Sequence, residues 1–107
     1  MNWLLSQVAH AVDGRLVGAD QALNGVSTDT RAIGPGQLFI ALSGDNFDAH
    51  DFLAQAVTSG AVALLVADAA KLPAGVPAVV VADTRLALGR LAAAWRASFA
   101  LPVIAVT

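Results

Sequence analysis

The sequence predicts an α/β domain with a small, mostly parallel sheet flanked by helices. Three short apolar runs support this prediction, at residues 38–42, 61–66 and 78–81. Continuous apolar runs of this length are typical of strands that are buried on both faces of a sheet. Segments with helical periodicity alternate with them, and such alternation indicates parallel crossover connections. We therefore expect the three runs to form neighbouring strands.

The composition is that of a globular domain with few charges. The chain has 107 residues, of which 57% are apolar and 13% charged, and its net charge is −2. No cluster of Lys and Arg forms the basic stripe that nucleic-acid binding requires. The lack of Cys excludes disulfides and thiolate metal sites, and no apolar run approaches the length of a membrane span. The N-terminus has no basic signal-peptide region, so we expect a cytoplasmic protein.

The first part of the chain is predicted to hold a helix followed by two short strands. Asn2 is expected to cap the helix and Gly14 to end it. Strands are expected at 15–18 and 25–27, joined by a turn over 20–24. His10 lies off the apolar face and is expected to be solvated. That face is formed by Leu4, Leu5, Val8, Ala9, Ala11 and Val12.

A second helix is predicted between the first two apolar runs. It is expected to begin at Asp48 or His50, where carboxylates favour the helix dipole, and to end at Gly60. A tight turn at 34–36, Gly-Pro-Gly, precedes the first run. The buried face of the second helix is expected to contain Phe52, Leu53, Ala56 and Val57.

A third, longer helix is predicted after the last of the three runs. Asp83 and Thr84 are expected to cap its start, and Pro102 is expected to prevent its continuation. Residues 103–106 are then expected to form a final buried strand. One side of this helix carries Leu88, Leu91, Trp95 and Phe99.

Two polar loops flank the first apolar run, at 27–31 and 43–50. Ligands of open α/β sheets bind at the carboxyl ends of strands, so these loops suggest a site for an anionic, hydroxyl-rich small molecule. Arg31 would grip a phosphate, and Phe47 would stack on a base. The alternative is two ordinary loops whose polar side chains satisfy their own backbone, with Arg31 paired to Asp29 and Phe47 packed in the core. The pattern alone favours the ordinary loops.

Other chemistries have less support in the sequence. The calcium-loop pattern fails because Phe47 and Ala49 occupy positions that need oxygen ligands, so no metal site is predicted. No nucleophile-elbow motif surrounds Ser27 or Ser43. No glycine-rich loop with a following Lys is present to cradle phosphates.

Several segments, in the same order, resemble the N-terminal domain of the Mur ligases, and they span nearly the whole chain. They are Ser-Thr-Asp-Thr-Arg at 27–31, the stretch 35–44, the stretch 47–52, Ala-Val-Thr-Ser-Gly-Ala at 56–61, Val-Ala-Asp-Thr-Arg-Leu at 81–86 and Val-Ile-Ala-Val-Thr at 103–107.

The resemblance implies a part of an ATP-dependent ligase of peptidoglycan synthesis in the bacterial cytoplasm. Such ligases phosphorylate a UDP-sugar peptide with ATP, with Mg²⁺ as cofactor, and an incoming amine attacks the acyl phosphate. The N-terminal domain holds the UDP moiety, and no catalytic residue is expected in this chain. The UDP-binding residues implied by the resemblance are Ser27, Thr28, Asp29, Thr30, Arg31, Asn46, Phe47, Asp48 and His50.

The resemblance also implies a division of the chain. Residues 1–82 correspond to the UDP-substrate-binding domain, and residues 83–107 to the first helix and strand of a central ATP-binding domain. Thr107 would lie at the edge of an ATP phosphate loop beyond this chain. The chain itself is therefore expected to bind neither ATP nor Mg²⁺.

One departure from the family pattern bears on the substrate. The ligase that adds the third peptide residue has a His-Gln-Ala triplet where this chain has Asp45, Asn46 and Phe47. The difference favours the family member that adds D-alanyl-D-alanine to UDP-N-acetylmuramoyl-tripeptide. Two alternatives remain open, the sister ligase and a non-catalytic nucleotide-sugar-binding or interaction module on the same scaffold.

Overall fold

A five-stranded sheet organises the molecule, with the strand order β2-β9-β8-β5-β4. We describe it from a computed structural model that covers residues 3–29, 33–44, 47–48, 52–73 and 75–103. The elements are β1 (Trp3–Leu4), α1 (Leu5–Ala11), β2 (Arg15–Val17), β3 (Ala22–Leu23), β4 (Val26–Ser27), β5 (Leu38–Ile40), β6 (Ser43–Gly44), β7 (Phe47–Asp48), α2 (Leu53–Thr58), β8 (Ala63–Val66), the 3-10 helix η2 (Ala69–Lys71), β9 (Ala78–Val80) and α3 (Thr84–Val103).

The centre of the sheet confirms the predicted fold class. Strands β4, β5, β8 and β9 are parallel to their neighbours, and only the edge strand β2 runs antiparallel. The three apolar runs form the adjacent strands β5, β8 and β9, as expected. All residues of β5 and β8 are buried, because both faces of these strands are covered.

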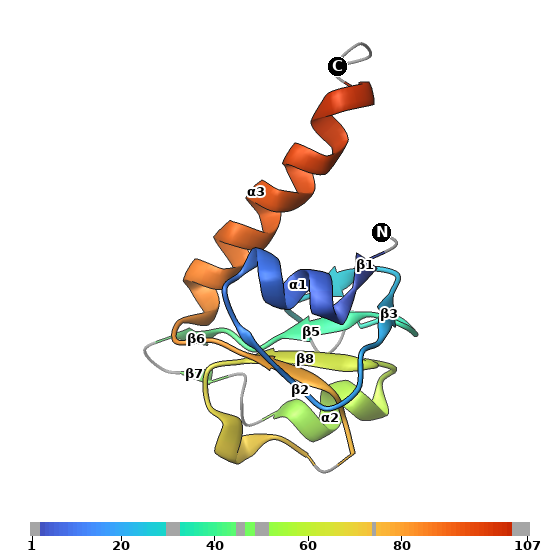
Figure 1. Cartoon of the computed structure of the whole chain (residues 1–107). Helices are drawn as coiled ribbons and strands as arrows, with labels where there is room; N and C mark the ends of the chain where they lie inside the picture. The colour runs from blue at the N-terminus through green and yellow to red at the C-terminus, as the bar shows by residue number, and fades with distance from the viewer. Residues whose placement is uncertain (1–2, 30–32, 45–46, 49–51, 74, 104–107) are drawn as a thin grey trace.

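Helices cover both faces of the sheet. Alternate residues of β5 point to opposite sides, so Leu38 and Ile40 join one core and Phe39 joins the other. The first core contains α1 and the start of α3, and the second contains α2. Figure 1 shows this arrangement, with α1 and α2 on opposite sides of the strands.

Helix α1 is held at its N-terminus by a carboxylate from a distant loop. Asp20 accepts a hydrogen bond from the Ser6 N–H at 2.9 Å and another from the Ser6 hydroxyl at 2.7 Å. These bonds satisfy donors that the first turn leaves free. They also lower the pKa of Asp20, chiefly through the Ser6 side chain. The predicted cap, Asn2, lies outside the described residues.

Three predictions for this region need correction. Leu4 is in β1 and is 44% exposed, so the buried face of α1 consists of Leu5, Val8 and Ala9, continued by Val12. The expected turn at 20–24 contains a strand, β3, because Trp3 and Leu4 of β1 offer it a pairing partner. The helix ends at Ala11 and the left-handed residue after it is Asp13, so Gly14 does not end the helix as predicted. Strands β2 and β4 form where predicted, and His10 is exposed as expected.

The segment after β5 also differs from the prediction. Asp48 does not start a helix, because it pairs with Ser43 in the β6–β7 hairpin. Helix α2 therefore begins at Leu53, and Phe52 precedes it with 38% of its surface exposed. Leu53 and Ala56 are buried as predicted, and the helix is followed by Gly60 with a φ of 124°.

Helix α3 begins as predicted, with Asp83 at its N-terminus. The Asp83 carboxylate accepts from the N–H groups of Arg85 at 2.9 Å and Leu86 at 3.2 Å. Its first turns pack against the domain, and the helix then extends away from it (Figure 1). Among the described residues, no helix combines the length and hydropathy needed to cross a membrane.

The predicted end of α3 is wrong in part. The helix includes Pro102 and continues to Val103 rather than stopping before the proline. A strand at Val103 would need a neighbouring strand to pair with. The other residues of the predicted strand, 104–106, lie outside the described residues.

Candidate functional site

The carboxyl edge of the parallel strands brings the predicted polar loops to one place. Strands β4 and β5 are adjacent and parallel, in the register Val26↔Leu38 and Ser27↔Phe39. The loop after Ser27 and the β6–β7 hairpin after β5 therefore leave the sheet at the same edge. This is the edge where ligands of open α/β sheets bind.

The first polar loop begins with a local turn. The Asp29 N–H donates to Ser27 Oγ at 3.1 Å, and the Ser27 hydroxyl donates to the Asp29 carbonyl at 3.2 Å. The Ser27 hydroxyl thus satisfies its own backbone, as the alternative interpretation of this loop expected. Thr28 is exposed and Asp29 half-buried. Ser27 shapes the turn, and Thr28 presents a side chain to solvent.

The other predicted binding residues are placed only partly. Phe47 and Asp48 form β7, so the hairpin brings them back toward the end of β5. Thr30, Arg31, Asn46, His50 and Thr107 lie outside the described residues. Their roles stay predictions. In the described part of the chain, no group of acidic and His side chains is arranged to hold a metal ion.

The return of the first loop to β5 has a well-defined geometry. Asn24 Nδ2 donates to the Pro35 carbonyl at 3.0 Å, and the Gly34 N–H donates to Gln37 Oε1 at 2.9 Å. Gly36 has a φ of 81°, and a Cβ there would lie 2.7 Å from Asn24 Nδ2. The predicted Gly-Pro-Gly turn is therefore confirmed, and it requires glycine at position 36.

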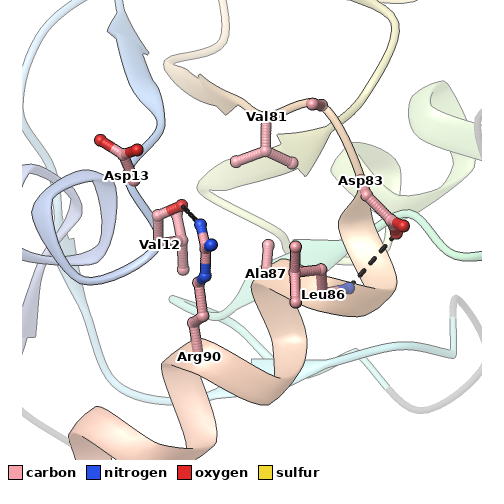
Figure 2. Close-up of a pocket in the computed structure, with 8 residues that line it drawn as sticks. Val12, Asp13, Val81, Asp83, Leu86, Ala87 and Arg90 are labelled. Carbon is pink, nitrogen blue, oxygen red and sulfur yellow. Dashed lines mark hydrogen bonds between the residues drawn. The ribbon is translucent and has the colours of Figure 1, made fainter.

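A second feature at the same edge is a cavity of about 230 Å³ where β9 meets α1 and α3. Figure 2 shows that it lies between the end of α1 and the first turns of α3. Its lining combines aliphatic side chains with three charged residues. The lining residues are Val12, Asp13, Val81, Ala82, Asp83, Leu86, Ala87 and Arg90.

Arg90 crosses one side of this cavity. Its Nη1 donates to the carbonyl oxygen of Val12 at 3.5 Å, so α3 is linked to the end of α1 (Figure 2). Asp13 follows Val12 with a φ of 55°, the left-handed conformation that often terminates helices. The Asp83 carboxylate is directed to the α3 backbone and caps that helix.

Sequence reasoning missed this cavity. Its lining comes from two stretches that are far apart in the chain, residues 12–13 and residues 81–90. The family-like segment at 81–86 gave no indication that a cavity lies there. The only available signals were the predicted helix end beside Gly14 and the predicted cap at Asp83.

Comparison with known proteins identifies the family. The sequence model described as "Mur ligase family, catalytic domain" matches residues 22–96, from β3 into α3. This chain belongs to the Mur ligase family. The resemblance inferred from the sequence segments is therefore confirmed.

Curated Mur ligases are similar to most of this chain. The UDP-N-acetylmuramoyl-tripeptide–D-alanyl-D-alanine ligase of Escherichia coli (strain K12) is 50% identical over 103 residues, which cover 96% of this chain and 22% of that protein. The UDP-N-acetylmuramoyl-L-alanyl-D-glutamate–2,6-diaminopimelate ligase of Geobacter sulfurreducens is 37% identical over 107 residues, covering 96% and 21%. The chain thus spans about a fifth of the length of these Mur ligases.

Solved Mur ligase structures share the fold. MurF from Acinetobacter baumannii is similar with a TM-score of 0.82 and 36% identity, over 94% of this chain and 22% of that one. MurF from Thermotoga maritima, solved in complex with ADP, is similar with a TM-score of 0.63 and 25% identity, and the match covers 71% of this chain and 17% of that one.

Proposed function

We propose that this chain is the UDP-substrate-binding part of an ATP-dependent ligase that adds D-alanyl-D-alanine to UDP-N-acetylmuramoyl-tripeptide. The observation that carries the proposal is the 50% identity, across 96% of the chain, to a ligase named for that reaction. The reaction belongs to peptidoglycan synthesis, and its place is the bacterial cytoplasm.

The choice between the two ligase types rests on two observations. Asp45, Asn46 and Phe47 stand where the ligase that adds the third residue has His-Gln-Ala. The identity to the diaminopimelate-adding ligase, 37%, is also lower than the 50% to the dipeptide-adding ligase. An amine-donor assay on the complete protein distinguishes the two types. Turnover with D-alanyl-D-alanine indicates the dipeptide-adding ligase, and turnover with diaminopimelate indicates the ligase that adds the third residue.

The proposed binding site for the UDP moiety is the polar edge formed by the loop after β4 and the β6–β7 hairpin. The Ser27 turn orients the loop so that Thr28 faces solvent. Arg31 follows within this loop and supplies a planar guanidinium for the pyrophosphate. The contribution of this part is binding and orientation, because the UDP moiety is remote from the acyl group that reacts.

We assign the ATP chemistry to the remainder of the ligase, beyond this chain. Lys71, the sole lysine of the sequence, lies in η2 and outside any glycine-rich loop, so the residues present do not fit an ATP phosphate site. The proposed boundary follows residue 82, which makes α3 the first helix of the central ATP-binding domain. ATP and Mg²⁺ then belong to the complete enzyme.

The Arg31→Ala variant of the complete ligase tests the proposed binding role. We expect KM for the UDP substrate to rise about ten- to a hundredfold, because a hydrogen bond to a charged group is lost. We expect kcat to stay nearly constant, because the contact is equal in ground and transition states. Arg31→Lys should restore part of the affinity, since an ammonium lacks the planar fork.

A melting curve on the same variants provides the control. If Arg31 has only a structural role, Arg31→Ala lowers the melting temperature and leaves KM unchanged. An unchanged KM in a folded variant would remove Arg31 from the site. Turnover by the complete ligase in the absence of the UDP substrate would reject the proposed function as a whole.

A further inference from the structure

The junction between α3 and the rest of the domain is narrow. Thr84, Ala87 and Leu91 are 4%, 2% and 2% exposed, so the first two turns of α3 pack against the domain. Farther along, Ala92, Ala93 and Arg96 are exposed, and Figure 1 shows the helix leaving the body of the domain. The direction of this long helix therefore depends on a few contacts near its start.

The cavity lies within this junction. It is bounded by the end of α1, the segment after β9 and the first turns of α3, and its volume is about 230 Å³. Several of its lining residues are exposed, among them Asp13, Asp83 and Arg90, so the cavity is open to solvent. On this side, α3 packs less closely than along its buried residues Thr84 and Leu91.

Arg90 makes one long hydrogen bond across that gap. Its guanidinium donates to the Val12 carbonyl at 3.5 Å, which is the C-cap position of α1 (Figure 2). A helix leaves its last carbonyls without intrahelical partners, and its C-terminal end attracts a cation. The contact thus joins the C-terminal end of one helix to the side of another.

We propose that Arg90 is a positioning residue that sets the angle of α3 relative to the sheet, with the cavity as the volume into which the helix can tilt. The consequence for catalysis rests on the proposed function, in which α3 leads from the UDP-binding part to the ATP-binding domain. The angle of α3 then determines how the bound substrate is presented to the acyl-phosphate chemistry.

Distance measurements between spin labels test the inference on this chain. Because the sequence has no Cys, the exposed residues Ala54 of α2 and Ala93 of α3 can be labelled as Ala54→Cys and Ala93→Cys. We expect Arg90→Ala to broaden or shift the distance distribution and Arg90→Lys to restore it in part. Arg96→Ala is the matched control, since Arg96 is an exposed arginine of the same helix and does not line the cavity.

Kinetics of the complete ligase provide the functional readout. We expect Arg90→Ala to lower kcat about three- to tenfold, with KM for the UDP substrate within about twofold of the wild-type value. If Arg90 merely stabilises the fold, the variant has a lower melting temperature but a normal kcat well below it. That result, or an unchanged label distance, would overturn the inference. The label distance does not depend on what the chain binds, so the inference and the proposed function can fail separately.

Discussion

The residues of the buried strands β5 and β8 have a different role from the residues of the loops at the carboxyl edge of the sheet. Phe39 of β5 and Leu64 of β8 are 1% and 0% exposed and pack in the same core. At the end of β4, the strand beside β5, Thr28 is exposed and the Ser27 hydroxyl is bonded within its own turn. The strands contain apolar side chains that cannot recognise a polar ligand, whereas Ser27, Thr28 and Asp29 are polar.

Mutations in the two regions should therefore have different effects. A change in the strands should alter the free energy of unfolding and affect binding only through the folded fraction. A change at the tips of the loops should alter binding and leave stability nearly constant. Residues that shape the loops, such as Gly36 and Asp20, lie between these extremes.

The largest effect is expected from Phe39→Ala. Removing a fully buried phenyl ring leaves a cavity between β5 and α2, and such changes cost about 3–5 kcal/mol of stability. Phe52→Ala is the matched control, because Phe52 is 38% exposed and should cost less than half as much. Urea unfolding of both variants measures the difference. Equal losses would show that the centre of the sheet is not the main core.

A smaller effect is expected from Gly36→Ala, which lies in the return of the first polar loop. The left-handed conformation costs a non-glycine residue about 1–2 kcal/mol. The new Cβ would also lie 2.7 Å from Asn24 Nδ2 and displace its bond to the Pro35 carbonyl. Gly75→Ala measures the cost of the left-handed conformation alone, because Gly75 has the same φ of 81° and nothing lies within 4 Å of its Cβ position.

Thermal unfolding of the two glycine variants separates the conformational cost from the cost of the clash with Asn24. We expect Gly36→Ala to unfold at the lower temperature of the two. If the variants unfold at the same temperature, the Asn24 contact contributes nothing and the loop is less defined than the structure indicates.

The smallest effect concerns pH and Asp20, a loop carboxylate with a structural role. Its pKa is below the ordinary 3.8, mainly because the Ser6 hydroxyl and N–H donate to the charged form. A lowered pKa in the folded state means that Asp20 stabilises the fold above 3.8 and that this stability is lost as the pH falls through the lowered value.

Comparison of the wild-type chain with Asp20→Asn tests this assignment. We expect the wild type to be more stable at neutral pH and the difference to shrink below pH 3.8. Chemical denaturation at several pH values measures it. A difference that stays constant down to low pH would show that the Asp20 carboxylate does not hold the start of α1.

The sequence predicted the centre of the fold better than its periphery. Strands β5, β8 and β9 were predictable because a continuous apolar run can be buried on both faces only inside a sheet. The β6–β7 hairpin was not, because its strands have two residues each and no alternating pattern. Strand β3 was missed for the same reason, since it depends on pairing with the equally short β1.

The candidate site, too, was predictable from the sequence only in part. The two polar loops that flank the first apolar run were predicted to form one site. The parallel pairing of β4 with β5, which brings them to the same edge, was not predicted. The bond between Arg90 and Val12 was not predictable, because it joins residues 78 positions apart through a backbone carbonyl. Local patterns hold no information about such contacts.

Binding of the UDP substrate to the ¹⁵N-labelled chain tests the central claim most directly. We expect UDP-N-acetylmuramoyl-tripeptide to cause saturable amide shifts at the polar edge, for example at Thr28, Asp29, Phe47 and Asp48. The cavity residues Val12 and Arg90 serve as the internal control and should shift little. UDP alone should reproduce most of the pattern, because the proposed site holds that moiety. Absence of saturable shifts, or shifts confined to the cavity, would contradict the account.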